Sequence, residues 1–110
     1  MTVDLPLRIE SVANLREHWA KRAKRAKAHR MAALAIKPHL LPCVVTLTRI
    51  APRALDDDNL RSGFKNFRDG IADRLGIADN DPRVEWRYAQ ERGKPKEYAA
   101  RVKIEPLGNP

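Results

Sequence analysis

An acidic segment, "LDDDNL" at residues 55–60, interrupts a chain that is otherwise strongly basic. Asp56 and Asp58 are separated by one residue, so both carboxylates would point to the same side if the segment is extended. Such carboxylates repel one another unless a cation lies between them, and oxygen ligands suit Mg²⁺ or Mn²⁺. Asn59 would orient this site or cap the next helix. Capping is the alternative explanation for the acidic residues, since Asp and Asn accept hydrogen bonds from the first amides of a helix.

A second acidic segment, "ADNDP" at residues 78–82, supplies Asp79 and Asp81 just before another strand pattern. Carboxylates that hold divalent ions activate water and stabilise the leaving oxygen in many nucleases. Lys65 follows the first segment by two helical turns, where its ammonium would neutralise a phosphate or a transition-state charge. Its alternative role is an ion pair with Asp69, four residues further along the same helix face.

The charge balance points to a polyanionic partner. The 110 residues include 22 Lys and Arg against 14 Asp and Glu, a formal net charge of +8. The segment "REHWAKRAKRAKAHR" contains one acid, so its like charges repel, and a phosphate backbone would relieve that repulsion. An ordinary solvated helix face is the alternative. We expect seven residues of this segment to contact nucleic acid: Arg16, Lys21, Arg22, Lys24, Arg25, Lys27 and Arg30.

The remaining composition narrows the class of protein. The longest apolar runs fall short of the roughly 18 to 20 residues that span a bilayer, and the start of the chain lacks a secretory layout. We therefore expect a cytoplasmic protein with no membrane partner and no small-molecule cofactor. Cys43 is the one cysteine and lies in the apolar run "CVVTLTRI", which predicts a buried structural thiol.

The hydrophobic patterns predict one α+β domain over residues 1–110, with the order β-α-β-α-β-β and both helices packed on a small mixed sheet. The length suits a single core. Predicted strands cover residues 5–10, 43–50, about 84–88 and about 98–104, with "RGKP" joining the last two as a hairpin. Predicted helices run from Ser11 or Asn14 to about Ile36, and from about Asn59 to Gly76.

The pattern "LDDDNL…K…GIADNDPRV" resembles the D-x-D-N signature and later acidic loop of the RusA-like crossover junction endodeoxyribonucleases, which are small Holliday junction resolvases often carried by prophages. The resemblance covers roughly residues 43–105. It implies a homodimer that binds Mg²⁺ through three carboxylates and uses a helix lysine. In the family that lysine follows the second aspartate by one turn, where this chain has Ser62. The implied residues are Asp56, Asp58, Asp81 (with Asp79 as the alternative) and Lys65.

The expected function is therefore a Mg²⁺-dependent endonuclease that hydrolyses phosphodiesters in four-way or other branched DNA with metal-activated water. A helix from Asn59 to Leu75 would be about 24 Å long, so Asp81 must return along the following loop or come from a partner subunit. Trp86 and Tyr88 would line the dimer interface or belong to the core. The alternatives are a noncatalytic DNA-binding protein with the same fold, and an RNA-binding or structural protein whose acidic turn only caps a helix.

Overall fold

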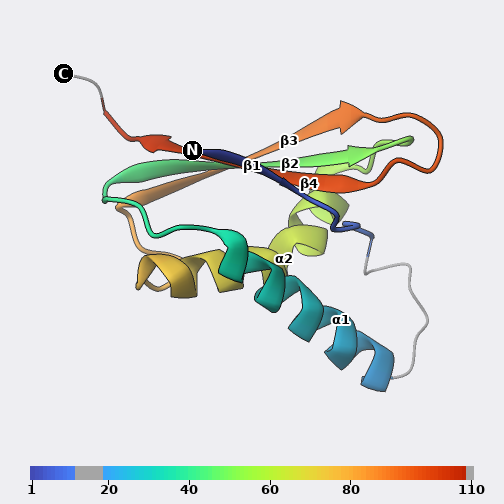
Figure 1. The fold of residues 1–110 in the computed structure, drawn as a ribbon, viewed down its shortest axis with the longest axis horizontal. Coiled ribbons are helices and arrows are strands. Elements are labelled where there is room, and N and C mark those ends of the chain that lie inside the picture. Colours follow the sequence, from blue (N-terminus) through green and yellow to red (C-terminus); the bar gives the residue numbers. More distant parts are fainter. Residues whose placement is uncertain (12–18, 109–110) are drawn as a thin grey trace.

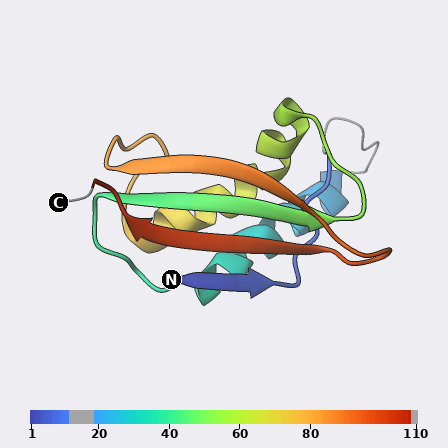
Figure 2. The same ribbon diagram turned by 90° about the horizontal axis from the view of Figure 1, so that it is seen from above.

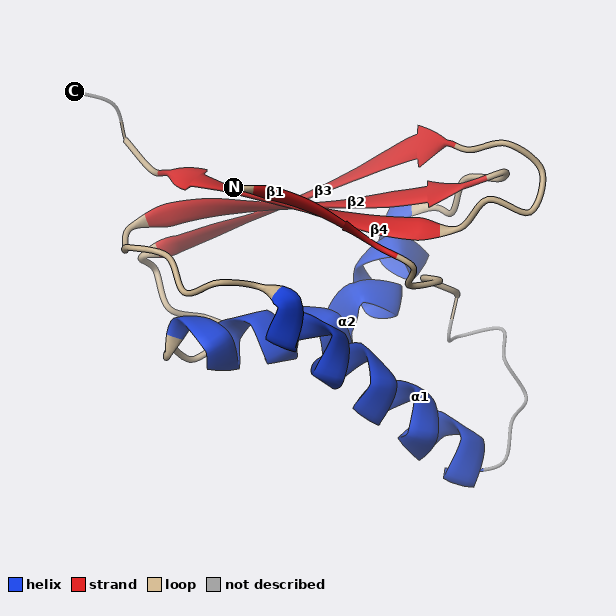
Figure 3. Cartoon of the chain, in the orientation of Figure 1, coloured by secondary structure: helices blue, strands red, loops and turns tan. Residues whose placement is uncertain are grey.

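The computed structural model describes residues 1–11 and 19–108 of the chain. Its elements, in order, are β1 (Thr2–Leu5), α1 (Trp19–Ala32), the 3₁₀ helix η2 (Ala33–Ala35), β2 (Cys43–Ala51), α2 (Asp57–Leu75), β3 (Val84–Arg92) and β4 (Ala99–Pro106). The predicted α+β order is confirmed, since the four strands form one mixed sheet (Figure 1). Both α-helices lie on the same side of that sheet (Figure 3).

The strand order in the sheet is β1-β4-β2-β3. Strand β2 pairs in parallel with β3 and antiparallel with β4, and β1 pairs antiparallel with β4, as Figure 2 shows. The predicted hairpin between β3 and β4 is therefore wrong, because β2 lies between them. Apart from two half-buried threonines, β2 is buried throughout, and a strand with so little polar surface is best placed at the centre of a sheet.

The first two elements begin and end at other residues than the patterns predicted. Strand β1 ends at Leu5, just before Pro6, which has no backbone N–H to donate to a ladder. Ile9 lies outside the strand and is nevertheless buried in the core. Helix α1 ends at Ala32, and one turn of 3₁₀ helix replaces its predicted continuation. Of its two predicted starts, Ser11 is described and is not part of a helix, whereas Asn14 lies in residues 12–18, outside the described part of the chain.

The core lies between the helices and the covered face of the sheet. An apolar stripe along α2 faces the sheet: Leu60, Phe64, Phe67 and Ile71 are buried there, and Leu75 at its end is partly buried. It meets alternating residues of the strands, among them Val45, Leu47, Val102 and Ile104. The end of α1 and the start of η2 cross α2 at Gly70, where an added Cβ would lie 2.8 Å from the Cβ of Ala33 and 2.9 Å from the backbone carbonyl oxygen of Arg30. The basic helix is thus held against the helix that follows the first acidic segment.

The other face of the sheet carries no described helix (Figure 1), and its charges are paired with one another. Nε of Arg101 lies 2.8 Å from Oδ1 of Asp4, and its Nη1 lies 2.6 Å from Oε2 of Glu91. These two carboxylates raise the pKa of the Arg101 guanidinium. Arg87 pairs with Glu85 on the same face. Because these arginines are neutralised locally, an approaching polyanion would find the excess positive charge on other surfaces.

Candidate functional site

The first acidic segment forms the N-terminus of α2. Asp56 is the N-cap residue, with φ −71° and ψ 166°, and its Oδ1 accepts a hydrogen bond of 2.9 Å from the backbone N–H of Asn59. Asp57 and Asp58 already lie in the first helical turn. The same-side arrangement expected of an extended segment therefore does not apply, since helical residues two apart do not face each other. Capping occupies Asp56, whereas the carboxylates of Asp57 and Asp58 have no partner among the described residues.

The segment that leads into α2 is held by Gln90 of β3. The side-chain carbonyl of Gln90 accepts from the backbone N–H of Leu55, and its amide donates to the backbone carbonyl of Leu55, both at 2.8 Å. The start of α2 is thereby attached to the end of β3. Gln90 was not among the predicted site residues. The signal in the sequence is that this polar residue continues the every-second-residue series of Trp86 and Tyr88, which faces the helices.

The second acidic segment turns the chain into β3. Arg83 lies beside Asp81, with Nη2 2.8 Å from Oδ2 and Nε 3.1 Å from Oδ1, and its backbone N–H also donates to Oδ1. These hydrogen bonds lower the pKa of Asp81 to about 2. Asp79 differs, because its backbone carbonyl accepts from Arg68 and Trp86 while its carboxylate has no hydrogen bond within the described ranges. Of the two aspartates, Asp79 is the freer potential ligand.

The two acidic segments lie at opposite ends of the β2–β3 pair. Cys43 is opposite Val84 and Ala51 is opposite Arg92 in this parallel ladder, so one segment follows the end of β2 and the other precedes the start of β3. The eight residue steps from Cys43 to Ala51 correspond to a strand length of about 26 Å. Among the residues that the structure describes, no three His, Cys, Asp or Glu side chains are placed to hold a metal ion. The predicted three-aspartate site does not form within one chain.

Lys65 makes the ion pair that was its alternative role. Its Nζ lies 3.4 Å from Oδ2 of Asp69, and its side chain is 73% exposed. Ser62, at the family's lysine position, donates from Oγ to the backbone carbonyl of Asp58. A contact between Lys65 and substrate remains a prediction.

Two aromatic residues of β3 are half-buried and pack against the core. The guanidinium of Arg68 stacks over the ring of Trp86 at 4.5 Å and donates to the hydroxyl of Tyr88 at 2.9 Å. The core contact expected as one alternative is confirmed for Trp86 and Tyr88. Their place in a dimer interface remains a prediction.

Helix α1 presents most of its basic side chains to solvent. Residues 19–24 are exposed all round the helix, which projects beyond the sheet (Figure 1). Arg30 is engaged with α2, since Nη2 lies 2.6 Å from Asp73, and Arg25 is half-buried. Arg16 lies outside the described residues. Four exposed cations have no ion pair within the described part of the chain and remain available to phosphate: Lys21, Arg22, Lys24 and Lys27.

Comparisons with known proteins assign no family. No family model matches the chain. It is similar to an uncharacterized protein of Xylella fastidiosa (strain Temecula1 / ATCC 700964), with 42% identity over an alignment that covers 60% of this chain and 51% of the relative. The chain thus spans about half the length of that relative. None of the helices described is long and apolar enough to cross a membrane.

Proposed function

We propose that this protein is a RusA-like homodimer that binds branched DNA and cleaves it in the presence of Mg²⁺. The observation that carries this proposal is the separation of the two acidic segments along a strand whose outer edge is open. Strand β3 is at the end of the sheet order, and no described strand pairs with its outer side. A second copy of the chain is therefore able to pair there.

A two-fold pairing of β3 with itself would bring unlike ends together. In an antiparallel pair the start of one strand lies beside the end of the other, so Asp79 would approach the end of the partner's β3. At that end, Gln90 holds the segment leading to α2. Asp56 and Asp58 would then face the second acidic segment of the partner subunit, and each dimer would contain two such sites.

The residues of β3 suit one such register. With the axis at Trp86, Glu85 lies opposite the partner's Arg87, and Arg87 lies opposite the partner's Glu85, so opposite charges meet across the strands. Registers centred on Arg87 or Tyr88 place like charges opposite each other. Each of these three registers carries Asp79 past the partner's Gln90, so the approach of the carboxylates does not choose among them. Charge pairing favours the register at Trp86 over the other two.

The roles of the residues follow from their surroundings. Asp58 and the second oxygen of Asp56 are free to bind a cation, and the partner's Asp79 or Asp81 would complete the set. A bound Mg²⁺ would neutralise phosphate charge and activate water. The exposed lysines and arginines of α1 would hold the DNA backbone, since each phosphate contact releases condensed counterions. A dimer also supplies the two symmetry-related cuts that resolution of a four-way junction needs.

The test is subunit complementation on a synthetic four-way junction. Asp58→Asn and the double variant Asp79→Asn/Asp81→Asn should each be inactive alone with Mg²⁺. When the two chains are refolded together, half of the dimers contain one intact composite site, so nicking should recover to about a quarter of the wild-type level. Failure to recover activity would rule out a shared site. Full activity of either variant alone would rule out these carboxylates.

A noncatalytic DNA-binding protein with the same fold is the second candidate. Its support is that capping engages Asp56 and Arg83 engages Asp81, so both carboxylates have structural roles. This candidate predicts a chain that sediments at its 12.5 kDa monomer mass and binds the junction without cutting it. The endonuclease proposal predicts twice that mass at micromolar concentration.

A further inference from the structure

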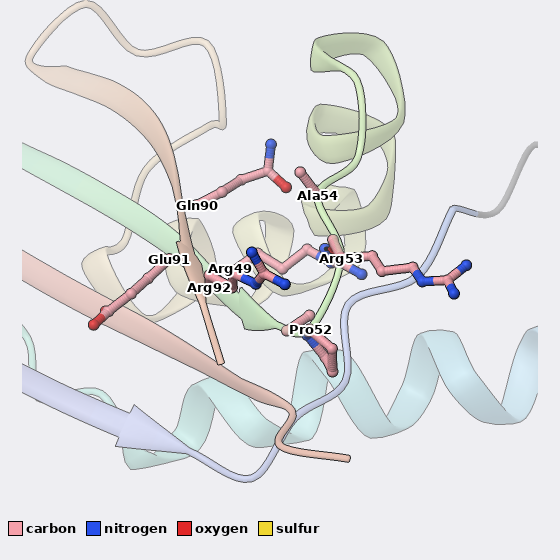
Figure 4. A pocket seen from close by; sticks show the side chains of 8 residues that line it. Arg49, Pro52, Arg53, Ala54, Gln90, Glu91 and Arg92 are labelled. Atoms are coloured by element: carbon pink, nitrogen blue, oxygen red, sulfur yellow. Dashed lines mark hydrogen bonds between the residues drawn. The ribbon is translucent and has the colours of Figure 1, made fainter. Parts of the chain in front are cut away.

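A cavity of about 370 Å³ lies where β2 and β3 end, beside the segment that leads to α2. Figure 4 shows its side chains, which come from the two strands and from the loop after β2. The residues that matter for its chemistry are Arg49, Pro52, Arg53, Gln90, Glu91 and Arg92. Three of these six side chains are guanidinium groups.

Arg49 contributes a buried positive charge. Its residue is only 7% exposed, and its Nε donates to the backbone carbonyl of Ile9 at 2.8 Å. Its Nη1 donates to the backbone carbonyl of Arg53. These acceptors are neutral, and no carboxylate pairs with Arg49 in the described ranges. Burial lowers the pKa of Arg49, and the smaller opposing effects of Tyr98 and Glu10 do not offset it.

The acid at the cavity does not neutralise this charge. Figure 4 shows the side chain of Glu91 pointing away from the arginines, and its carboxylate bonds to Arg101 at 2.6 Å. Neither Arg53 nor Arg92 forms an ion pair with any described residue, and both are exposed. Three arginines therefore line the cavity, and the carboxylate of Glu91 is not directed at them.

We propose that this cavity binds a phosphate group of a nucleic-acid backbone through Arg49 and Arg92, with Arg53 at its rim. A guanidinium presents paired N–H donors that match phosphate oxygens, and a low-exposure site strengthens that interaction. Gln90 ties the cavity to Leu55, the residue before Asp56. The bound phosphate would thus lie next to the first acidic segment. This assignment rests on the DNA binding of the proposed function and is independent of metal and cleavage.

The test compares two basic residues on opposite faces of the sheet. Arg92→Gln removes a cavity cation that makes no hydrogen bond with the described residues, so the fold should persist; Arg49 is avoided because its backbone contacts hold Ile9 and Arg53. Lys103→Gln is the control, since Lys103 pairs with Glu105 on the uncovered face of β4 and lies outside the proposed dimer interface. Junction affinity is measured by fluorescence anisotropy without divalent metal at several salt concentrations.

One lost phosphate contact should lower the slope of log K against log salt by about 0.9, so between 50 and 200 mM salt the wild-type affinity should fall about 3.5-fold more than that of Arg92→Gln. The control should keep the wild-type slope. An unchanged slope in Arg92→Gln would overturn the proposal, as would a wild-type protein that does not bind the junction.

Inorganic phosphate separates a nucleic-acid site from a general small-anion site. Phosphate should raise the melting temperature of the wild type and of Lys103→Gln more than that of Arg92→Gln, because an anion that binds only the folded state stabilises it. A phosphate effect that depends on Arg92, combined with an unchanged DNA slope, would show a small-anion pocket and would overturn the assignment to a DNA backbone. Failure of complementation alone would refute the shared metal site and leave this proposal standing.

Discussion

Replacing Gly70 by alanine should destabilise the protein, although alanine is the better helix former. An added Cβ would lie 2.8 Å from the Cβ of Ala33 and 2.9 Å from the backbone carbonyl oxygen of Arg30. Carbon atoms in contact are ordinarily about 3.5 to 4.0 Å apart, so α1 would have to move away from α2. One of the two contacts is with backbone, which has no rotamer with which to yield.

The expected magnitude follows from two opposing effects. Overpacking of a well-packed site costs about 1 to 3 kcal/mol, and we take the upper half of that range because both contacts are below 3.0 Å. Exchange of glycine for alanine inside a helix contributes about 1 kcal/mol in the opposite direction. The net loss should be about 1 to 2 kcal/mol, which corresponds to a melting temperature about 5 to 10 °C lower for a domain of this size.

Thermal unfolding followed by circular dichroism measures this effect. Asn66→Ala is the matched control, because Asn66 is a half-buried position of the same helix and its side chain makes no hydrogen bond with the described residues. It should leave stability unchanged or raise it slightly through helix propensity. If Gly70→Ala melts at or above the wild-type temperature, the close crossing of α1 and α2 is not the constraint that we infer.

Three further predictions concern charge. Changing to glutamine the four exposed cations of α1 that have no ion pair among the described residues should lower the salt slope of junction binding by up to about 3.6, at about 0.9 for each contact; the four are Lys21, Arg22, Lys24 and Lys27. If anisotropy shows an unchanged slope, the main DNA surface lies elsewhere. Burial, with a smaller effect of Arg25, lowers the pKa of His29 below 6.5, so the unfolded chain binds the proton more readily than the folded one. The stabilising contribution of neutral His29 should therefore be fully present above about pH 6.5 and be lost as the pH falls below that value. His29→Leu should make the melting temperature less dependent on pH between about pH 7.5 and 5. Arg83→Gln should raise the pKa of Asp81 from about 2 toward its ordinary 3.8, as measured by carboxyl NMR titration; an unchanged pKa would mean that Arg83 is not the cause.

Helix α2 was predictable because its signals are local. The apolar stripe, the acidic N-terminus and the stop at Gly76 all depend on residues within a few positions of one another. The structure has Asp56 as N-cap and Gly76 in the left-handed conformation, with φ 72°, at the C-cap. Sequence spacing identifies such a helix because each of its backbone hydrogen bonds closes over four residues.

Partners between strands were not predictable in the same way. Alternation along β3 and β4 identified two strands, but it carries no information about which strand lies beside which. Strand β2 lies between them although it ends more than 30 residues before β3 begins. Its place depends on the burial of its almost wholly apolar side chains. The hairpin prediction failed because the nearest strand in sequence was not the one that buried the most apolar surface.

The same distinction applies to the candidate sites. The sequence by itself determined the two acidic segments, the charge of α1 and the possibility that an Asp or Asn of the first segment caps the helix, whereas the structure identified Asp56 as that cap. Only the tertiary structure decided that the parallel β2–β3 ladder separates the acidic segments, and that Arg49 and Arg92, from different strands, meet at one cavity. The physical reason is that capping and helix periodicity act over a few residues, whereas the place of a strand in the sheet is set by burial over the whole core.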